Sequence, residues 1–543
     1  MNVLHWRALA VAVVLGVVLN LAHDWAPTLL AQGPTAGATP ARGAGEGLGP
    51  FKTLVIRGAI LIDGTGGPPR GPVDIVVEGN RIAAIRSAGT PGLPLLPNRP
   101  PEKADHEIEA TGMYVLPGFV DLHAHAGASA DKPAEYSYKL WLAHGVTTVR
   151  GVGLGPHEWT VEEQRRSARN EILAPRIFNY QRPGGAWEGG ALDTPEKARE
   201  WVRWAAQNGV DGMKMGAGRP EIMGALLDEA KKHGLGSTAH LGQTGVAQMN
   251  AITAARLGLG TVTHFYGHFE SLLKDHVVQT WPVNQINNDE QHRFGQVARL
   301  WNQIHPPGSP EWKAYLEEHL KLGTTFDPTM AIYSASRDVM RARNADWHEK
   351  YTLPWLMDRF EANREVHGSY WYYWTTWDEV AWRNFYQVWF QLLNDYKKMG
   401  GRVTTGSDSC CIYQNQGFGY ILELEMLQEA GFHPLEVFQA ATMNGALTLH
   451  EPKGRPIEFG VVREGLLADM VIVDQNPLEN LKVLYGTGAV KLNDQTRRVE
   501  RVGGIKWTIK DGIAYDAKKL LADVAAMVEK QKRARSTTAP SGR

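Results

Sequence analysis

The stretch GFVDLHAHAG, residues 118–127, follows the apolar run MYVLP and places two histidines, His123 and His125, one residue apart. Because alternate side chains of a β-strand face the same side, both imidazoles would point into one space from the end of a buried strand. Paired imidazoles can bind a metal ion there. Two surface histidines on a loop would show the same spacing. Other residues of the chain are therefore needed to distinguish a metal site from a surface loop.

Strand and helix patterns alternate through the middle of the chain. Helical patterns such as residues 196–209 and 219–234 separate short apolar runs, which indicates βα units and a parallel sheet. The strand candidates are residues 114–125, 145–152, 176–180, 211–216, 236–241, 261–267, 324–330 and 402–408. Eight such units predict a (β/α)8 TIM barrel, an α/β fold whose active site lies at the C-terminal ends of its strands.

Segments with a strand pattern flank this middle. Residues 53–64 and 73–87 alternate apolar and polar positions, and a similar pattern returns at residues 468–477 and 504–515. We therefore predict a small β-sandwich domain built from both chain ends. The predicted domains are the sandwich at residues 51–115 and 452–515, the barrel at 116–451, and a C-terminal helix and tail at 516–543.

The N-terminal segment has the character of an export signal. Residues 8–19 form an unbroken apolar run after Arg7, with the length of a signal-peptide core and short for a membrane span. We expect residues 1–31 to be a signal peptide or an uncleaved N-terminal anchor, and the Gly-, Ala- and Pro-rich residues 32–50 to be a flexible linker. The expected location is exported, periplasmic or secreted, with membrane contact only through an uncleaved N-terminal segment.

The charge balance gives no sign of a nucleic-acid partner, and the cysteine content gives no sign of a disulfide framework. The chain has 57 Lys and Arg residues against 58 Asp and Glu, so no basic excess points to a nucleic-acid partner. Its two cysteines, Cys410 and Cys411, are adjacent, which leaves no separated pair for a disulfide framework. The pair could be two thiols that line a pocket or a strained vicinal disulfide.

The segment from about residue 268 to 401 is longer than one βα unit needs. It contains a very aromatic run at residues 369–393. At helical spacing such side chains make a core, or a face buried between the subunits of a homo-oligomer. The alternative is a lid whose rings line a pocket for an apolar or aromatic part of a small-molecule substrate.

Further polar residues stand at the ends of the predicted strands. Lys214 lies on the inward face of the fourth strand, although a buried ammonium must be paired or lose its proton. His240 ends the fifth strand, His264 the sixth and Asp408 the eighth. Imidazole and carboxylate suit zinc and similar ions, so the convergence of these residues with the paired histidines predicts a metal centre.

Taken in order with the motif PGFVDLHAH, the strand-end residues resemble the amidohydrolase superfamily of metal-dependent hydrolases, in its binuclear, imidazolonepropionase- and prolidase-like form. The resemblance covers residues 53 to about 515. It implies two divalent metal ions, with zinc as the expected element, and six ligands: His123, His125, Lys214, His240, His264 and Asp408. Lys214 would bridge both ions as a carbamate derived from carbon dioxide. The two histidines of the motif would hold the more buried ion together with Asp408.

The resemblance also implies the reaction, which is cleavage of an amide (C–N, peptide-like) bond through a metal-bridging hydroxide. Asp408 would act as general base and then as general acid, in addition to its role as a ligand. The expected substrate is a dipeptide, a prolyl or N-acyl amino acid, or an aromatic amide of that kind. The alternatives are hydrolysis of a cyclic amide, lactone or phosphoester, deamination, or a non-catalytic metal-stabilised scaffold.

Four neighbouring residues are weaker candidates. Tyr266 and His268 follow the sixth-strand ligand and could orient the substrate or serve the structure alone. Asp327 is expected to cap a turn rather than to bind metal. Arg150 lies at the end of the second strand, and Gly151 follows it where relatives often carry an acidic residue. We therefore expect no substrate contact from this loop by analogy with the relatives.

Overall fold

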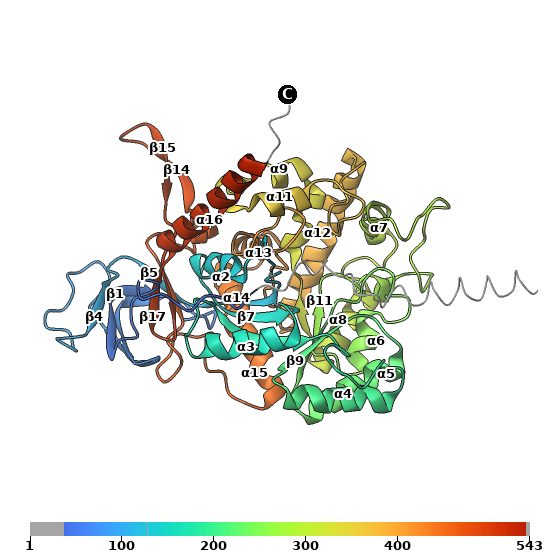
Figure 1. Cartoon of the computed structure of the whole chain (residues 1–543), viewed down its shortest axis with the longest axis horizontal. Helices are drawn as coiled ribbons and strands as arrows, with labels where there is room; N and C mark the ends of the chain where they lie inside the picture. Colours follow the sequence, from blue (N-terminus) through green and yellow to red (C-terminus); the bar gives the residue numbers. More distant parts are fainter. Residues whose placement is uncertain (1–36, 128, 539–543) are drawn as a thin grey trace, which may run out of the picture.

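Short strands of buried β-branched and small residues form the centre of the computed structural model, which describes residues 37–127 and 129–538 (Figure 1). They make one parallel sheet in the order β12-β11-β10-β9-β8-β7-β6, so neighbours in sequence are neighbours in space. The strands are β6 (Phe119–Ala124), β7 (Val146–Val152), β8 (Arg176–Gln181), β9 (Gly212–Met215), β10 (Gly236–Ala239), β11 (Thr261–Thr263) and β12 (Thr325–Asp327). The predicted signal peptide, residues 1–31, lies outside the described residues.

The barrel is closed between β12 and β6 by residues 402–408, the predicted eighth strand. This closing segment forms a single parallel bridge to Phe326 and is not a regular strand. On its other side, Asp408 N donates to His123 O at 2.9 Å. Asp408 has a φ of 50°, outside the extended region, which ends the pairing there. The predicted (β/α)8 barrel is therefore confirmed, with the correction that its eighth strand is irregular.

The first predicted strand, residues 114–125, is in fact two strands. β5 (Tyr114–Pro117) pairs with β1 and β13 in another sheet, whereas β6 begins the barrel. The break falls at Gly118, where a Cβ would lie 2.2 Å from the Oγ1 of Thr147. The chain can pass from one sheet to the other within one residue because glycine leaves room for this close approach.

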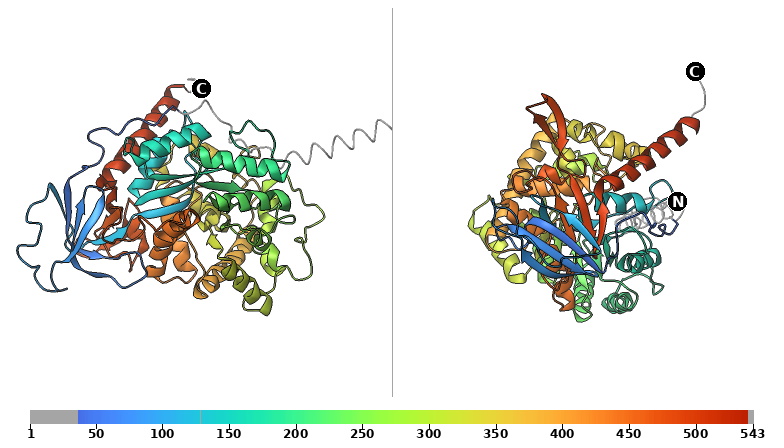
Figure 2. Two further views of the ribbon diagram at one scale, coloured as in Figure 1. Left: turned by 90° about the horizontal axis from the view of Figure 1, so that it is seen from below. Right: turned by 90° about the vertical axis from the view of Figure 1, so that its left-hand side faces the viewer.

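Both ends of the described chain contribute to the second sheet, in the order β17-β16-β13-β5-β1-β2-β3 with β4 beside β1. Figure 2 shows its blue N-terminal strands beside the red C-terminal ones. Besides β5, its strands are β1 (Thr53–Leu61), β2 (Arg70–Glu78), β3 (Arg81–Ser87), β4 (His106–Glu109), β13 (Met470–Val473), β16 (Ile505–Lys510) and β17 (Ile513–Asp516). Ile56, Ile75 and Ile472 belong to its separate apolar core. The predicted small β domain is thus one continuous sheet. A separate hairpin consists of β14 (Ala489–Asn493) and β15 (Arg498–Val502).

Several helices begin at a polar cap followed by proline. The Thr194 hydroxyl accepts from a backbone N–H at the start of α4, and the Ser309 hydroxyl does so at the start of α8. Proline suits the first helical position because its missing N–H needs no partner there. The α-helices are α2 (Ala134–Ala143), α3 (His157–Ala168), α4 (Pro195–Gln207), α5 (Pro220–Lys232), α6 (Ala251–Arg256), α7 (Glu290–Val297), α8 (Pro310–Leu322), α9 (Val339–Arg343), α10 (His348–Tyr351), α11 (Pro354–Phe360), α12 (Thr376–Lys398), α13 (Phe418–Glu429), α14 (Pro434–Ala441), α15 (Met443–His450) and α16 (Ala517–Thr538). Within the described part of the chain, every helix is too short or too polar to span a bilayer.

The aromatic run predicted within residues 268–401 supplies most of helix α12. Its buried rings pack against Phe265, the residue after His264. The ring centroids of Phe385 and Trp389 lie 5.0 Å and 5.3 Å from that of Phe265. Trp377 near the start of the helix is 76% exposed and lies outside this packing. The structure therefore agrees with the core interpretation of the run.

Candidate metal centre

The barrel carries the six predicted ligands to one edge. β6 and the residue after its end bear the first two histidines, and β9 bears the lysine. The residues directly after β10 and β11 are the next two histidines, and the closing segment ends in the carboxylate. In chain order these residues are His123, His125, Lys214, His240, His264 and Asp408. They meet because the C-terminal ends of parallel strands lie at the same edge of a barrel.

Three of these side chains already have the spacing of a metal site. The Oδ1 of Asp408 lies 3.2 Å from the Nε2 of His125 and 3.6 Å from the Nε2 of His123. One ligand atom from each residue lies within 4.8 Å of the others. One carboxylate oxygen that faces two imidazole nitrogens is an arrangement that a divalent cation could occupy.

Lys214 completes this part of the centre. Its Nζ lies 2.8 Å from the Nε2 of His123, and its side chain is buried. Burial lowers the pKa of Lys214 to about 7; Asp408 opposes that effect, while Arg182 and Arg150 add to it. A large fraction of this amine is therefore uncharged at neutral pH.

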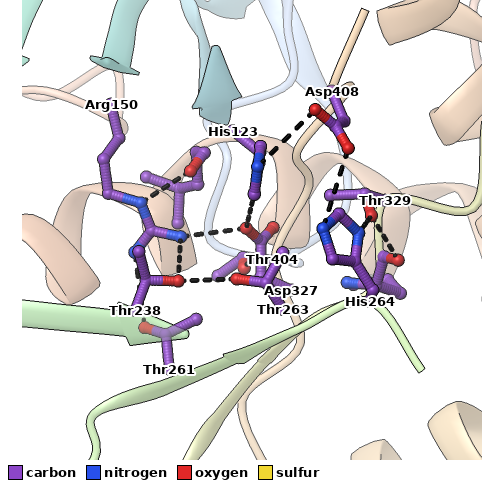
Figure 3. A network of polar contacts seen from close by, with 12 residues as sticks. His123, Arg150, Thr238, Thr261, Thr263, His264, Asp327, Thr329, Thr404 and Asp408 are labelled. Carbon is purple, nitrogen blue, oxygen red and sulfur yellow. Dashed lines mark hydrogen bonds and ion pairs between the residues drawn. The ribbon is translucent and has the colours of Figure 1, made fainter. Parts of the chain in front are cut away.

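His264 and His240 form the other half of the centre. The Nε2 of His264 lies 3.7 Å from the Oδ2 of Asp408, and its Nδ1 is hydrogen-bonded to the hydroxyl of Thr329 (Figure 3). The ring of His240 stands edge-on to that of His264, with 4.6 Å between the centroids. Asp408 thus faces histidines from both halves.

Three histidines of the centre are held in the neutral form. Burial holds the pKa values of His123, His240 and His264 well below the ordinary range, and the nearby Lys214 contributes to each shift. A neutral imidazole is the form that binds a metal ion. The Nε2 of His264 is buried and has no hydrogen-bond partner among the described residues, so a cation would satisfy it.

Beneath the centre lies a buried ion pair that corrects one prediction. Arg150 NH2 lies 2.9 Å from the Oδ2 of Asp327, and the same oxygen is 4.0 Å from the Nδ1 of His123 (Figure 3). Arg150 also donates through Nε to the carbonyl of Leu122 at 2.6 Å. Asp327 therefore faces the barrel interior and does not merely cap a turn. Burial raises the pKa of Asp327, and Arg150 opposes that shift.

The two predicted substrate contacts separate in the structure. Tyr266 lies with the centre, because its ring centroid is 4.6 Å from that of His240, and its hydroxyl accepts from Tyr333 at 3.0 Å. His268 is buried elsewhere, with its Nδ1 2.6 Å from the hydroxyl of Tyr315 on α8. The geometry keeps Tyr266 as a candidate and associates His268 with α8.

Some residues beside the centre were not singled out from the sequence. Asp121 accepts from Ser407 N at 2.9 Å and from the Ser407 hydroxyl at 2.6 Å, which ties β6 to the closing segment. Burial raises the pKa of Asp121 to about 7. Its position two residues before His123, on the same face of the strand, was the available signal. Thr329, the partner of His264, had no such signal.

The adjacent cysteines lie in the loop that follows Asp408. Cys410 and Cys411 are free thiols and half-buried. The Cβ of Cys411 lies 3.1 Å from the position that a Cβ on Gly368 would take, so this loop packs on the segment before α12. The structure therefore has two free thiols and not the vicinal disulfide that the sequence also allows.

Comparison with known proteins provides independent information. Residues 389–513, from within α12 to the start of β17, match the model of the Amidohydrolase family. A 312-residue alignment is 32% identical to adenine deaminase 2 of Rhizobium etli and covers 50% of this chain and 49% of that protein. A 108-residue alignment is 36% identical to N-acyl-D-aspartate deacylase of Alcaligenes xylosoxydans xylosoxydans, with 19% of each chain covered.

Among solved structures, a Xaa-Pro dipeptidase with methionine bound in its active site has a similar fold. It aligns over 86% of this chain and 100% of its own, with a TM-score of 0.53 and 18% identity. The chain spans about half the length of the deaminase that it matches. These comparisons agree with the barrel and the β domain described above.

Proposed function

We propose that this chain, which carries an amidohydrolase family domain, is a metal-dependent hydrolase that cleaves amide bonds of small molecules. The observation that carries the proposal is the geometry of the strand-end group. Ligand atoms of His123, His125 and Asp408 lie within 4.8 Å of one another, and the amine of Lys214 lies 2.8 Å from His123. Such a cluster of buried and half-buried donors at the catalytic edge of a barrel favours metal chemistry over a passive scaffold.

Two divalent ions fit this set of donors. His123 and His125 with Asp408 would hold one ion, and His240 with His264 the other. The buried, unpartnered Nε2 of His264 supports the fit, and nitrogen and oxygen donors of this kind suit zinc. Bound ions would lower the pKa of a water molecule and polarise the substrate carbonyl.

Lys214 would join the two halves of the centre. An ammonium ion there would be repelled by two divalent cations. Its neutral amine could instead add to carbon dioxide and release a proton, and the resulting anionic carbamate would supply oxygen donors for the ions. The contact with His123 and the pKa of about 7 for Lys214 support this step, because only the neutral amine has a free lone pair.

Asp408 is placed to move a proton. Its Oδ1 faces His123 and His125, whereas its Oδ2 faces His264. The side chain keeps 16% exposure, so part of it stays accessible to solvent while it lies beside the histidines. We assign to Asp408 the acceptance of the proton from the attacking water and its delivery to the leaving amine.

The proposed substrates are dipeptides, including prolyl ones, and N-acyl amino acids. The N-acyl-D-aspartate deacylase and the Xaa-Pro dipeptidase among the similar proteins support this class. The ring of Tyr266 lies beside that of His240 and contacts the ring of Tyr333. We infer from these aromatic rings a preference for an apolar or aromatic acyl group.

A second candidate function is deamination of a heterocycle, which the longer alignment with an adenine deaminase favours. The two functions differ in how they depend on Lys214. Deamination needs one activated water and can proceed at a single ion, whereas the proposed amidohydrolase uses the lysine as a bridge.

The experiment that tests the proposal is elemental analysis of the wild type and of Lys214→Ala, each purified without added metal and then dialysed against zinc. We expect about two ions per chain in the wild type and fewer in the variant, together with hydrolysis of N-acyl amino acids or dipeptides by the wild type alone. One ion or none in both proteins would refute the bridged centre. Ammonia release from adenine without amide hydrolysis would support the deaminase.

A further inference from the structure

Thr329, the hydrogen-bond partner of His264, has an unusual backbone. Its φ of 50° and ψ of 44° place it in the left-handed region, directly before the 3-10 helix η3 (Met330–Arg337). A β-branched residue is strained in that region and persists there only where its surroundings hold it. The structure must therefore contain groups that keep Thr329 in this conformation.

Two helices hold the residues that follow Thr329. Glu423 on α13 accepts through Oε2 from the backbone N–H of Ala331 at 2.7 Å. Tyr386 on α12 donates its hydroxyl to the carbonyl of Met330 at 2.6 Å. The two contacts fix the peptide group between Met330 and Ala331, one from each helix, and Thr329, Glu423 and Tyr386 are all fully buried.

The carboxyl of Glu423 is hard to explain as a source of stability. It lies at 0% exposure, and its Oε1 has no hydrogen-bond partner among the residues that the structure describes. A buried carboxyl with an unpartnered oxygen opposes folding, and an apolar side chain of similar shape would fill the space better. Acceptance of a hydrogen bond from the Ala331 N–H is the feature that only an oxygen at this place provides.

The hydroxyl of Thr329 constrains the protonation of His264. It donates to the carbonyl of Pro328 at 2.7 Å, and a hydroxyl has a single hydrogen. In its contact with the Nδ1 of His264 it must therefore accept, so Nδ1 carries the hydrogen. The lone pair of the neutral ring is then on Nε2, the buried atom that faces Asp408.

We propose that Glu423 is a positioning residue that holds the strained Thr329 through Met330 and Ala331, and thereby keeps His264 as the Nδ1–H tautomer with Nε2 free for a cation. The inference deepens the proposed function because it concerns the same centre. It also assigns a role to α12 and α13, which reach the metal centre through Tyr386 and Glu423.

The test uses metal-free full-length protein with 15N-labelled histidine, in which the signal of His264 is identified by its loss in His264→Gln. The two ring nitrogens give well-separated nitrogen shifts according to which one is protonated. We expect the Nδ1–H form in the wild type and in Glu423→Gln, whose amide oxygen can still accept a hydrogen bond from the Ala331 N–H. Glu423→Leu and Thr329→Val should show a mixture of tautomers. Thr508→Val, which removes another fully buried hydroxyl that donates to a backbone carbonyl, should leave His264 unchanged.

A second readout is zinc binding. Because Glu423→Leu loses this positioning, its zinc affinity at the lower-affinity site should fall by about 10- to 100-fold. This is the range seen when the residue that orients a metal ligand is removed. An Nδ1–H tautomer that persists in Glu423→Leu would overturn the inference, as would the Nε2–H form in the wild type. If Glu423→Leu does not fold, Thr329→Val decides by the same signal. Because the tautomer is read without metal, failure of the proposed function, seen as no zinc bound by the wild type, is distinguishable from failure of this inference.

Discussion

The amine of Lys214 lies 2.8 Å from the Nε2 of His123, with both side chains buried at the C-terminal edge of the barrel. Burial lowers the pKa of both groups, and the nearby Lys214 lowers that of His123 further. The contact makes the lysine available as a neutral amine beside the imidazole of a candidate metal ligand. The first two predictions follow from this relationship.

Metal uptake should depend on dissolved carbon dioxide. If Lys214 becomes a carbamate, metal-free wild type should take up its second zinc ion in bicarbonate buffer and fail to do so in buffer freed of carbon dioxide. Lys214→Ala should bind the same amount of zinc in both buffers. Zinc per chain after gel filtration measures the effect, and equal uptake by the wild type in both buffers would contradict the carbamate.

The stability of the metal-free protein should rise with pH because of Lys214. Its folded pKa of about 7 lies below the ordinary 10.5, so between these values the unfolded chain binds a proton that the folded chain does not. The free energy of unfolding therefore rises by up to about 1.4 kcal/mol per pH unit between the two pKa values. The destabilisation caused by burying Lys214 is largest below pH 7.

This dependence is measured by urea unfolding of the metal-free wild type and of Lys214→Met at pH 7, 8 and 9. Methionine has a similar shape and does not titrate, so other groups cancel in the difference between the two proteins. The wild type should gain on the variant as the pH rises. A constant difference would show that the lysine is charged in the fold throughout this range.

The pair of Arg150 and Asp327 should be sensitive to the loss of one partner. Asp327→Asn leaves a guanidinium buried at 0% exposure without its carboxylate, which should destabilise the protein by about 3–5 kcal/mol. The double variant Arg150→Met with Asp327→Leu removes both charges and should be less destabilised than the single variant. Urea unfolding measures the free energies of both variants. A double variant at least as destabilised as Asp327→Asn would mean that the two charges do not depend on each other.

Gly406 in the closing segment should not tolerate a side chain. A Cβ there would lie 2.7 Å from the Cβ of His123 and 2.8 Å from an oxygen of Asp327, so Gly406→Ala should displace His123 and reduce zinc binding. Gly224→Ala is the matched control on α5, where the nearest atom to the new Cβ is 3.5 Å away. That control should gain about 1 kcal/mol of stability because alanine favours helix. Zinc affinity unchanged in Gly406→Ala would show that His123 can shift without loss.

Much of the barrel could be predicted because its signals are local. Apolar runs that alternate with helical patterns identify the strands, and the residues at their C-terminal ends identify the face on which ligands gather. The division of residues 114–125 into two strands could not be predicted from the apolar pattern, which is continuous across it. It depends on Gly118 passing close to Thr147, a residue of the neighbouring strand.

Within the candidate centre, the sequence by itself determined the six strand-end residues and the edge at which they stand. Only the tertiary structure decided what lies behind them. Asp327 pairs with Arg150, which is 177 positions away, and His268 turns toward Tyr315 on α8 instead of toward the centre. The reason is physical: the alternation of a strand determines which face a side chain occupies, whereas its partner depends on how the closed barrel brings distant strands and helices together.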